Sequence, residues 1–90
     1  MYNPEYQAKF TIKEIENKTD KNFNSYYLLH FENGNYQHGY AFKNSVAKET
    51  LNTLTNAPEN FINRRVNITY SLNEINQYAF LQVKSITLIK

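Results

Sequence analysis

The chain has 90 residues, no cysteine and a net charge of +2, from 10 Lys and Arg against 8 Asp and Glu. The absence of cysteine excludes a disulfide framework and a thiolate metal site. No apolar run approaches the roughly 20 residues that a membrane-spanning helix needs. The N-terminus lacks the basic and apolar regions of a secretory signal, so we expect a small cytoplasmic protein with no membrane association.

Residues 1–7 are predicted to form an N-terminal tail, because Pro4 cannot donate a hydrogen bond to a sheet. Residues 8–90 are predicted to form a single domain, which begins with a strand over residues 8–17. The alternation of apolar residues in this strand changes phase near Lys13-Glu14, which indicates a bulge that bends it. The polar residues 18–25 predict a loop.

Residues 26–42 hold aromatic residues on two predicted strands with Asn33-Gly34 between them, which indicates a β-hairpin. The register depends on the loop, and a one-residue slip moves every side chain to the other face. A two-residue loop sets Tyr36 opposite Phe31 and crowds the apolar rows onto one face. A three-residue loop over residues 33–35 sets His38 opposite His30, and we favour this register.

The favoured register gives the hairpin two different faces. On one face large apolar side chains lie opposite Gly39 and Ala41, which suits a tightly curved interior. The other face is half polar, and its hydroxyl and imidazole groups need water or a partner. The interior face carries Tyr27, Leu29 and Phe31. The half-polar face carries Tyr26, Leu28, His30, Tyr36, His38, Tyr40 and Phe42.

Residues 44–56 are predicted to form the only helix, capped by Asn44 or Ser45. Its narrow apolar stripe consists of Ala47, Leu51 and Leu54. Pro58 bars continuation of the helix.

The rest of the chain predicts a loop and two further strands. Residues 59–64 are expected to form a loop that Phe61 and Ile62 anchor onto the core. Strict alternation predicts a strand over residues 65–72, followed by a polar turn at 73–76. The last strand covers residues 77–89, with a second bulge near Lys84-Ser85.

The order of these elements resembles the OB-fold, a five-stranded Greek-key barrel. The resemblance covers residues 8–89 and implies a mainly β protein with one helix between strands three and four. Tyr26, Tyr36, Tyr40 and Phe42 make the chain most similar to small single-stranded DNA-binding proteins of phages and bacterial mobile genetic elements. That similarity implies binding of single-stranded DNA or RNA in DNA replication or recombination, with a polymerase or helicase as a candidate partner.

Stacking gives this half-polar face a chemical use. Aromatic side chains hold unpaired bases without sequence preference, at about 1–3 kcal/mol per base, and flanking cations hold phosphates. The predicted nucleic-acid-binding residues are Tyr26, His30, Tyr36, His38, Tyr40, Phe42, Lys43, Arg64, Arg65 and Lys84, with Lys9 as a further cation. In the alternative interpretation the tyrosines pack a core or a subunit interface and the Arg pair ends a solvated loop.

Other functional classes have less support. His30 and His38 could begin a metal site with Glu32, but nothing enforces it, and we predict neither a metal nor another cofactor. The chain has no nucleophile motif and no phosphate loop, so we predict no enzyme activity. The alternative function is a protein-binding module, such as an accessory subunit of a replication enzyme or a small mobile-element inhibitor. A homodimer agrees with the sequence as well as a monomer does.

Overall fold

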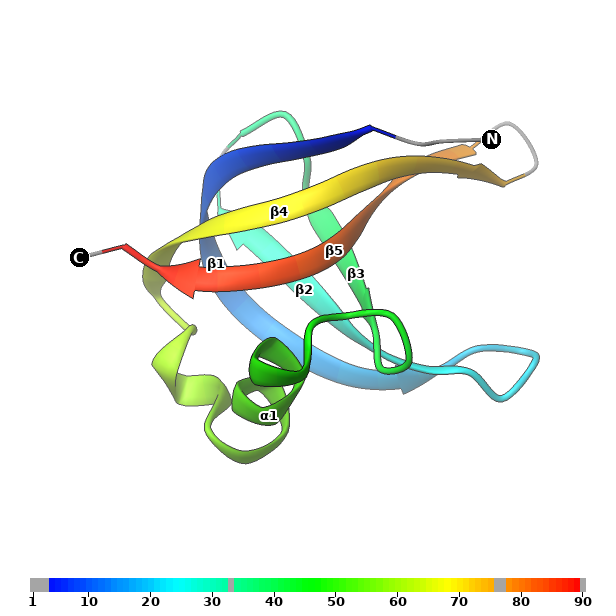
Figure 1. The fold of residues 1–90 in the computed structure, drawn as a ribbon, viewed down its shortest axis with the longest axis horizontal. Helices are drawn as coiled ribbons and strands as arrows, with labels where there is room; N and C mark the ends of the chain where they lie inside the picture. Colours follow the sequence, from blue (N-terminus) through cyan, green and yellow to red (C-terminus); the bar gives the residue numbers. More distant parts are fainter. Residues whose placement is uncertain (1–3, 33, 76–77, 90) are drawn as a thin grey trace.

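The computed structural model describes residues 4–32, 34–75 and 78–89 and folds them into a five-stranded sheet that closes into a ring (Figure 1). The strands are β1 (Glu5–Thr19), β2 (Ser25–Glu32), β3 (His38–Phe42), β4 (Arg64–Ile75) and β5 (Tyr78–Leu88). The helix α1 (Lys48–Asn56) and the 3-10 turn η1 (Pro58–Asn60) lie between β3 and β4. The prediction of a mainly β chain with a helix between the third and fourth strands is confirmed.

The ring closes because β1 is shared between two neighbours. Its first half pairs with β4 and its second half with β2, and the order around the ring is β1-β2-β3-β5-β4. The register of β1 against β2 shifts between Thr11 and Glu14, so the predicted bulge is present. All strand pairs are antiparallel except β3 with β5, which run parallel with Tyr40 opposite Gln82.

The second predicted bulge lies in β5. Thr69 of β4 pairs with Ser85, and the next residue, Tyr70, pairs with Val83. Lys84 is therefore the extra residue on β5, at the position that the phase change of the sequence indicated.

Two strands are longer than the sequence indicated. β1 begins at Glu5, which pairs with Ser71, so residues 5–7 of the predicted tail belong to the sheet, while residues 1–3 lie outside the described residues. β4 continues to Ile75 because its last residues pair with the start of β5. Residues 73–75 of the predicted turn are thus strand, and Asn76 lies outside the described residues.

The helix begins later than predicted, and neither proposed residue caps it. Asn44 and Ser45 lie in a turn, in which the backbone N–H of Ser45 donates to the carbonyl of Phe42. The N-cap is Ala47, which is exposed and makes no side-chain cap hydrogen bond. In the predicted apolar stripe Leu54 is buried and Leu51 is half-buried.

A buried threonine, rather than a wider apolar stripe, attaches the helix to the sheet. The Thr50 hydroxyl accepts a hydrogen bond from the Ile86 backbone N–H at 2.9 Å. The Ala47 N–H donates to the Lys84 carbonyl at 2.8 Å. These two contacts hold the start of α1 against the bulged part of β5.

The core fills the interior of the ring. The predicted inner face of the hairpin is confirmed, because Tyr27, Leu29 and Phe31 are buried opposite Gly39 and Ala41. Phe61 is also buried, as its anchoring role requires. Full burial of a large apolar side chain stabilises a fold by about 1.5–3 kcal/mol. The core consists of Phe10, Ile12, Tyr27, Leu29, Phe31, Ala41, Val46, Leu54, Phe61, Val66, Ile68, Tyr70, Leu81, Val83 and Ile86.

Candidate nucleic-acid interface

The hairpin of β2 and β3 has the favoured register. Tyr26 pairs with Phe42, and His30 pairs with His38. The connection is longer than the predicted three residues because β3 begins only at His38, and its residue 33 lies outside the described residues. The Phe31 N–H donates to the Gln37 carbonyl at 2.9 Å, which continues the same register one step past the strand.

Four aromatic rings meet on the outer face of β2, β3 and β5, and we call this set the aromatic surface. It consists of Tyr26, Tyr40, Phe42 and Phe80. Tyr26 lies 5.6 Å from Tyr40 and 5.5 Å from Phe42, measured between ring centroids. Tyr40 lies 5.5 Å from Phe80 at a steep angle. All four rings are half-buried, so each one keeps exposed area while packing on its neighbours.

Phe80 is a member that sequence reasoning missed. Leu81 and Val83 are buried, and alternation along β5 places Phe80 and Gln82 on the outer face. The parallel pairing of β5 with β3 then brings Phe80 beside Tyr40. The available signal was an aromatic residue in the polar phase of the last strand, but the pattern does not name the neighbouring strand.

The two histidines meet at the other end of the outer face. The His30 and His38 rings are 4.8 Å apart in an edge-to-face arrangement. His30 Nε2 donates to Glu16 Oε2 at 2.6 Å, and this hydrogen bond lowers the pKa of Glu16. The acidic partner of His30 is thus Glu16 of β1, which the sequence did not indicate, rather than Glu32. Among the described residues, no group of three or more His, Cys, Asp or Glu is arranged to hold a metal ion.

Tyr36 does not continue the outer row of the hairpin. Its ring packs edge-to-face on the buried ring of Tyr70, with centroids 6.0 Å apart, and the side chain is half-buried against the core. The cause is that regular pairing ends at His38, so the alternation of β3 does not extend to Tyr36. Tyr36 still lines a shallow groove of about 290 Å³ together with His38, Tyr40 and Phe80.

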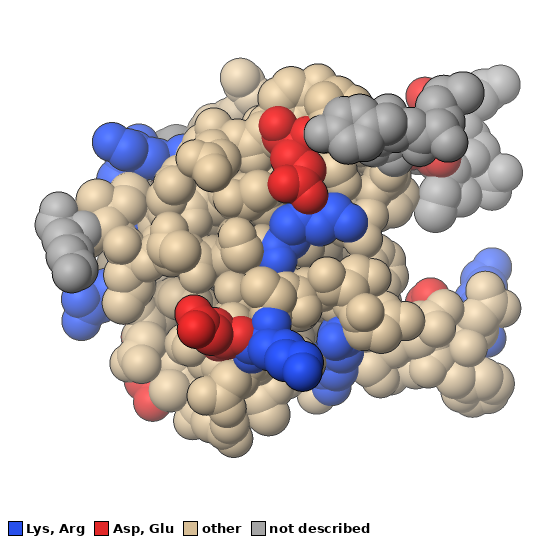
Figure 2. All heavy atoms as spheres, in the orientation of Figure 1, with Lys and Arg blue, Asp and Glu red and all other residues tan. Residues whose placement is uncertain are grey.

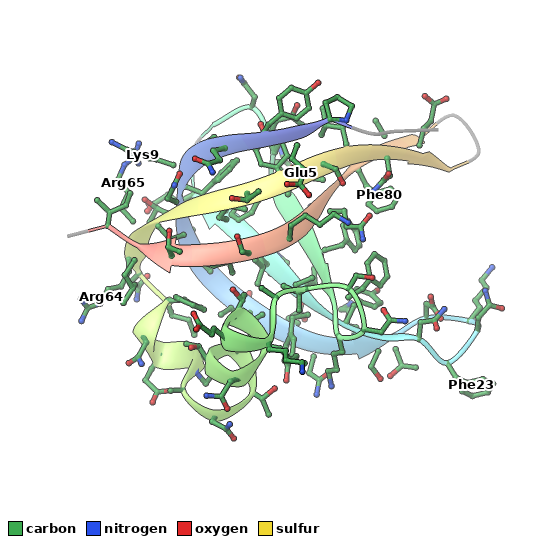
Figure 3. All side chains as sticks on the ribbon, viewed as in Figure 1. Glu5, Lys9, Phe23, Arg64, Arg65 and Phe80 are labelled. Carbon is green, nitrogen blue, oxygen red and sulfur yellow. The ribbon has the colours of Figure 1, made fainter. Side chains whose placement is uncertain are left out.

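The predicted cations are not all brought to this face. Figure 3 shows Arg64, Arg65 and Lys9 at the opposite end of the molecule from Phe80. The Arg pair begins β4 and is exposed there, so it does not flank the aromatic surface. In Figure 2, basic and acidic side chains are interspersed on the face shown and form no patch of a single sign.

The remaining predicted cations are Lys43 and Lys84. Lys43 follows Phe42 directly, but its Nζ lies 4.9 Å from the centroid of the Tyr27 ring, which belongs to the inner face. Lys84 is half-buried and is the extra residue of the β5 bulge, so the alternation that places Phe80 and Gln82 on the outer face does not extend to it. A further cation that the sequence did not indicate is Lys18, which is paired with Tyr26 across β1 and β2.

The outer face is electrically asymmetric along its length. Opposite β2, the β1 residue at the Tyr26 end is Lys18, and the residue at the His30 end is Glu14. Glu16 lies between them, opposite Leu28. Lys18 therefore favours phosphate groups at the aromatic end of this face.

No protein-family model, curated protein or solved structure matches this chain. No helix in the described part of the chain is long and apolar enough to cross a membrane.

Proposed function

We propose that this protein binds single-stranded nucleic acid, in the first place DNA, on the aromatic surface of an OB-fold barrel. The strand order around the ring and the helix between β3 and β4 support the OB-fold assignment. A shared topology does not by itself determine function, which depends on the residues of the site.

One observation carries the proposal: four aromatic rings cluster on the outside of a sheet whose inside is already filled. The core is complete without Tyr26, Tyr40, Phe42 and Phe80, and all four keep exposed area. Aromatic rings in contact on an open surface are the platform on which unpaired bases stack. A backbone that passes the rings meets Lys18, which is paired with Tyr26 across β1 and β2. Such a domain would serve replication or recombination of a bacterial or mobile-element genome.

The test is a fluorescence-anisotropy titration with labelled oligo-dT. Tyr40→Ala should weaken binding about tenfold, because it removes one stacking ring, whereas Tyr40→Phe keeps the ring and should bind as the wild type does. The double variant Arg64→Ala/Arg65→Ala is the control at the far end and should change affinity less than Lys18→Ala does. Absence of oligo-dT binding below about 100 μM at low salt would overturn the proposal, because contacts with phosphates strengthen as salt falls.

A second candidate function, a protein-binding module, is favoured by Phe23. This side chain is 87% exposed at the tip of the connection between β1 and β2. The Asp20 carboxylate accepts hydrogen bonds from the backbone N–H groups of Asn22 and Asn24 at 2.8 and 2.9 Å, so the turn that presents the ring is pre-organised. Pre-organised exposed aromatics anchor protein interfaces.

The same titration separates the two functions. Phe23→Asn should leave oligo-dT binding unchanged if the aromatic surface is the site. Protein binding would be the function instead under two conditions. The wild type would not bind oligo-dT, and a purified partner protein would bind the wild type but bind Phe23→Asn more weakly.

A further inference from the structure

A cavity of about 540 Å³ opens at the histidine end of the outer face. Its polar side chains carry one ammonium group, two imidazoles, a phenol, an amide and one carboxylate. It is lined by Lys13, Glu14, His30, Phe31, Gly34, Tyr36, Gln37 and His38. All but one of these polar side chains can donate a hydrogen bond, which is the donor set that an oxyanion needs.

The cavity is continuous with the proposed strand-binding site. Tyr36, Gln37 and His38 line both this cavity and the groove that leads to Tyr40 and Phe80. A nucleic-acid strand on the aromatic surface can therefore follow the groove into the cavity.

The charge of the cavity depends on the protonation of the histidines. Lys13 and Glu14 line the cavity and carry opposite charges, so the lining has no net charge while both imidazoles are neutral. Glu16 and Glu32 lie outside the lining, and Lys18 is close enough to Glu16 to lower its pKa. A protonated His30 pairs with Glu16 through their 2.6 Å contact, so a proton on the exposed His38 gives the cavity a surplus positive charge.

We propose that this cavity is a pH-dependent phosphate subsite: it holds a phosphate of the bound strand when His30 and His38 are protonated and holds it more weakly when they are neutral. The inference rests on the proposed function, because the strand on the aromatic surface delivers the phosphate. Histidine side chains ordinarily exchange their proton between pH 5 and 8. Binding of the strand therefore strengthens as pH falls through this range.

The chain allows a direct test because His30 and His38 are its only histidines. Oligo-dT affinity is measured at pH 8.0 and 5.5 at one ionic strength. The wild type should bind about tenfold more tightly at pH 5.5, as expected for one added charged phosphate contact. His38→Asn should abolish most of this gain, so that its affinities at pH 8.0 and 5.5 differ by less than about twofold. Lys13→Ala should lower affinity more at pH 5.5 than at pH 8.0.

A second measurement examines the subsite without the strand. The imidazole proton signals of His38 are followed by NMR at pH 5.5 as inorganic phosphate is added, with sodium chloride at equal ionic strength as the control. Specific shifts that saturate support the subsite, and identical responses to both salts overturn it. Equal oligo-dT affinity at the two pH values overturns the subsite while the proposed function stands; no oligo-dT binding at either pH overturns the function.

Discussion

A Cβ atom on Gly39 would lie 2.8 Å from Cζ of Phe31 and 3.1 Å from Cγ2 of Val83. The Phe31 ring is held in place because it stacks on Phe10, with ring centroids 4.4 Å apart. We expect Gly39→Ala to lower the free energy of unfolding by about 1–3 kcal/mol, the usual cost of overpacking a core. Urea denaturation followed by circular dichroism measures this loss.

The matched control is Phe31→Leu, which shortens the side chain that the new methyl group would strike. In the Phe31→Leu background, Gly39→Ala should lower the free energy of unfolding by less than it does in the wild type. The difference between the two losses is the coupling energy of the pair. An equal loss of unfolding free energy in both backgrounds would show that the contact with Phe31 is not the reason why residue 39 must be small.

Thr50 supplies a hydrogen bond that no apolar residue can replace. Thr50→Val keeps the shape of the side chain but leaves the buried N–H of Ile86 without its acceptor at 2.9 Å. We expect a loss of about 1–3 kcal/mol in the free energy of unfolding. Thr53→Val is the control, since its hydroxyl only donates to the Glu49 carbonyl on the exposed side of the same helix, and it should change stability by less than about 0.5 kcal/mol.

Phe23 has a positive φ angle of 64°, in the left-handed region that suits Asn and Gly but not a bulky side chain. Phe23→Asn should raise the free energy of unfolding by about 0.5–1 kcal/mol, because it relieves this strain without removing buried area. Phe23→Ala removes the exposed ring but keeps the strain, so it should gain less than Phe23→Asn. Equal gains from both variants would assign the effect to the exposed ring rather than to the backbone.

Tyr70 links stability to alkaline pH. Burial raises the pKa of Tyr70, and Tyr36 and Tyr6 nearby raise it further. Because the pKa in the folded state lies above that in the unfolded state, the stabilisation is complete below about pH 10 and is lost as pH rises through the folded value. The urea midpoint of the wild type should fall between pH 9 and 11, and Tyr70→Phe should reduce that fall. Tyr26→Phe, a half-buried tyrosine with an outward ring, should not reduce it.

Local patterns predicted the fold well where a face is buried. The hairpin register followed from Gly39 and Ala41, since only that register sets small residues opposite Tyr27 and Leu29. Both bulges followed from phase changes in the apolar alternation. In each case burial of one face constrains the pattern, so the sequence carries the information.

The composition of the site was less predictable because it depends on which strands become neighbours. Phe80 reaches the rings through the parallel pairing of β3 with β5, and Glu16 reaches His30 through the pairing of β1 with β2. Neither pairing is encoded in a local pattern. Tyr36 packs on Tyr70 because alternation does not extend beyond the last paired residue, and charge alone does not indicate at which end of the ring Arg64 and Arg65 lie.

The double pairing of β1 sets the order in which the molecule can be completed during its synthesis. Residues 5–12 are made early, yet their partners in β4, residues 64–71, leave the ribosome only when most of the chain has been translated. Closure therefore depends on contacts between distant parts of the chain, which slows folding compared with local pairing. The hairpin of β2 and β3 can form alone, but Phe80 comes with β5. A nascent or truncated chain without β5 would have neither a closed core nor the complete aromatic surface.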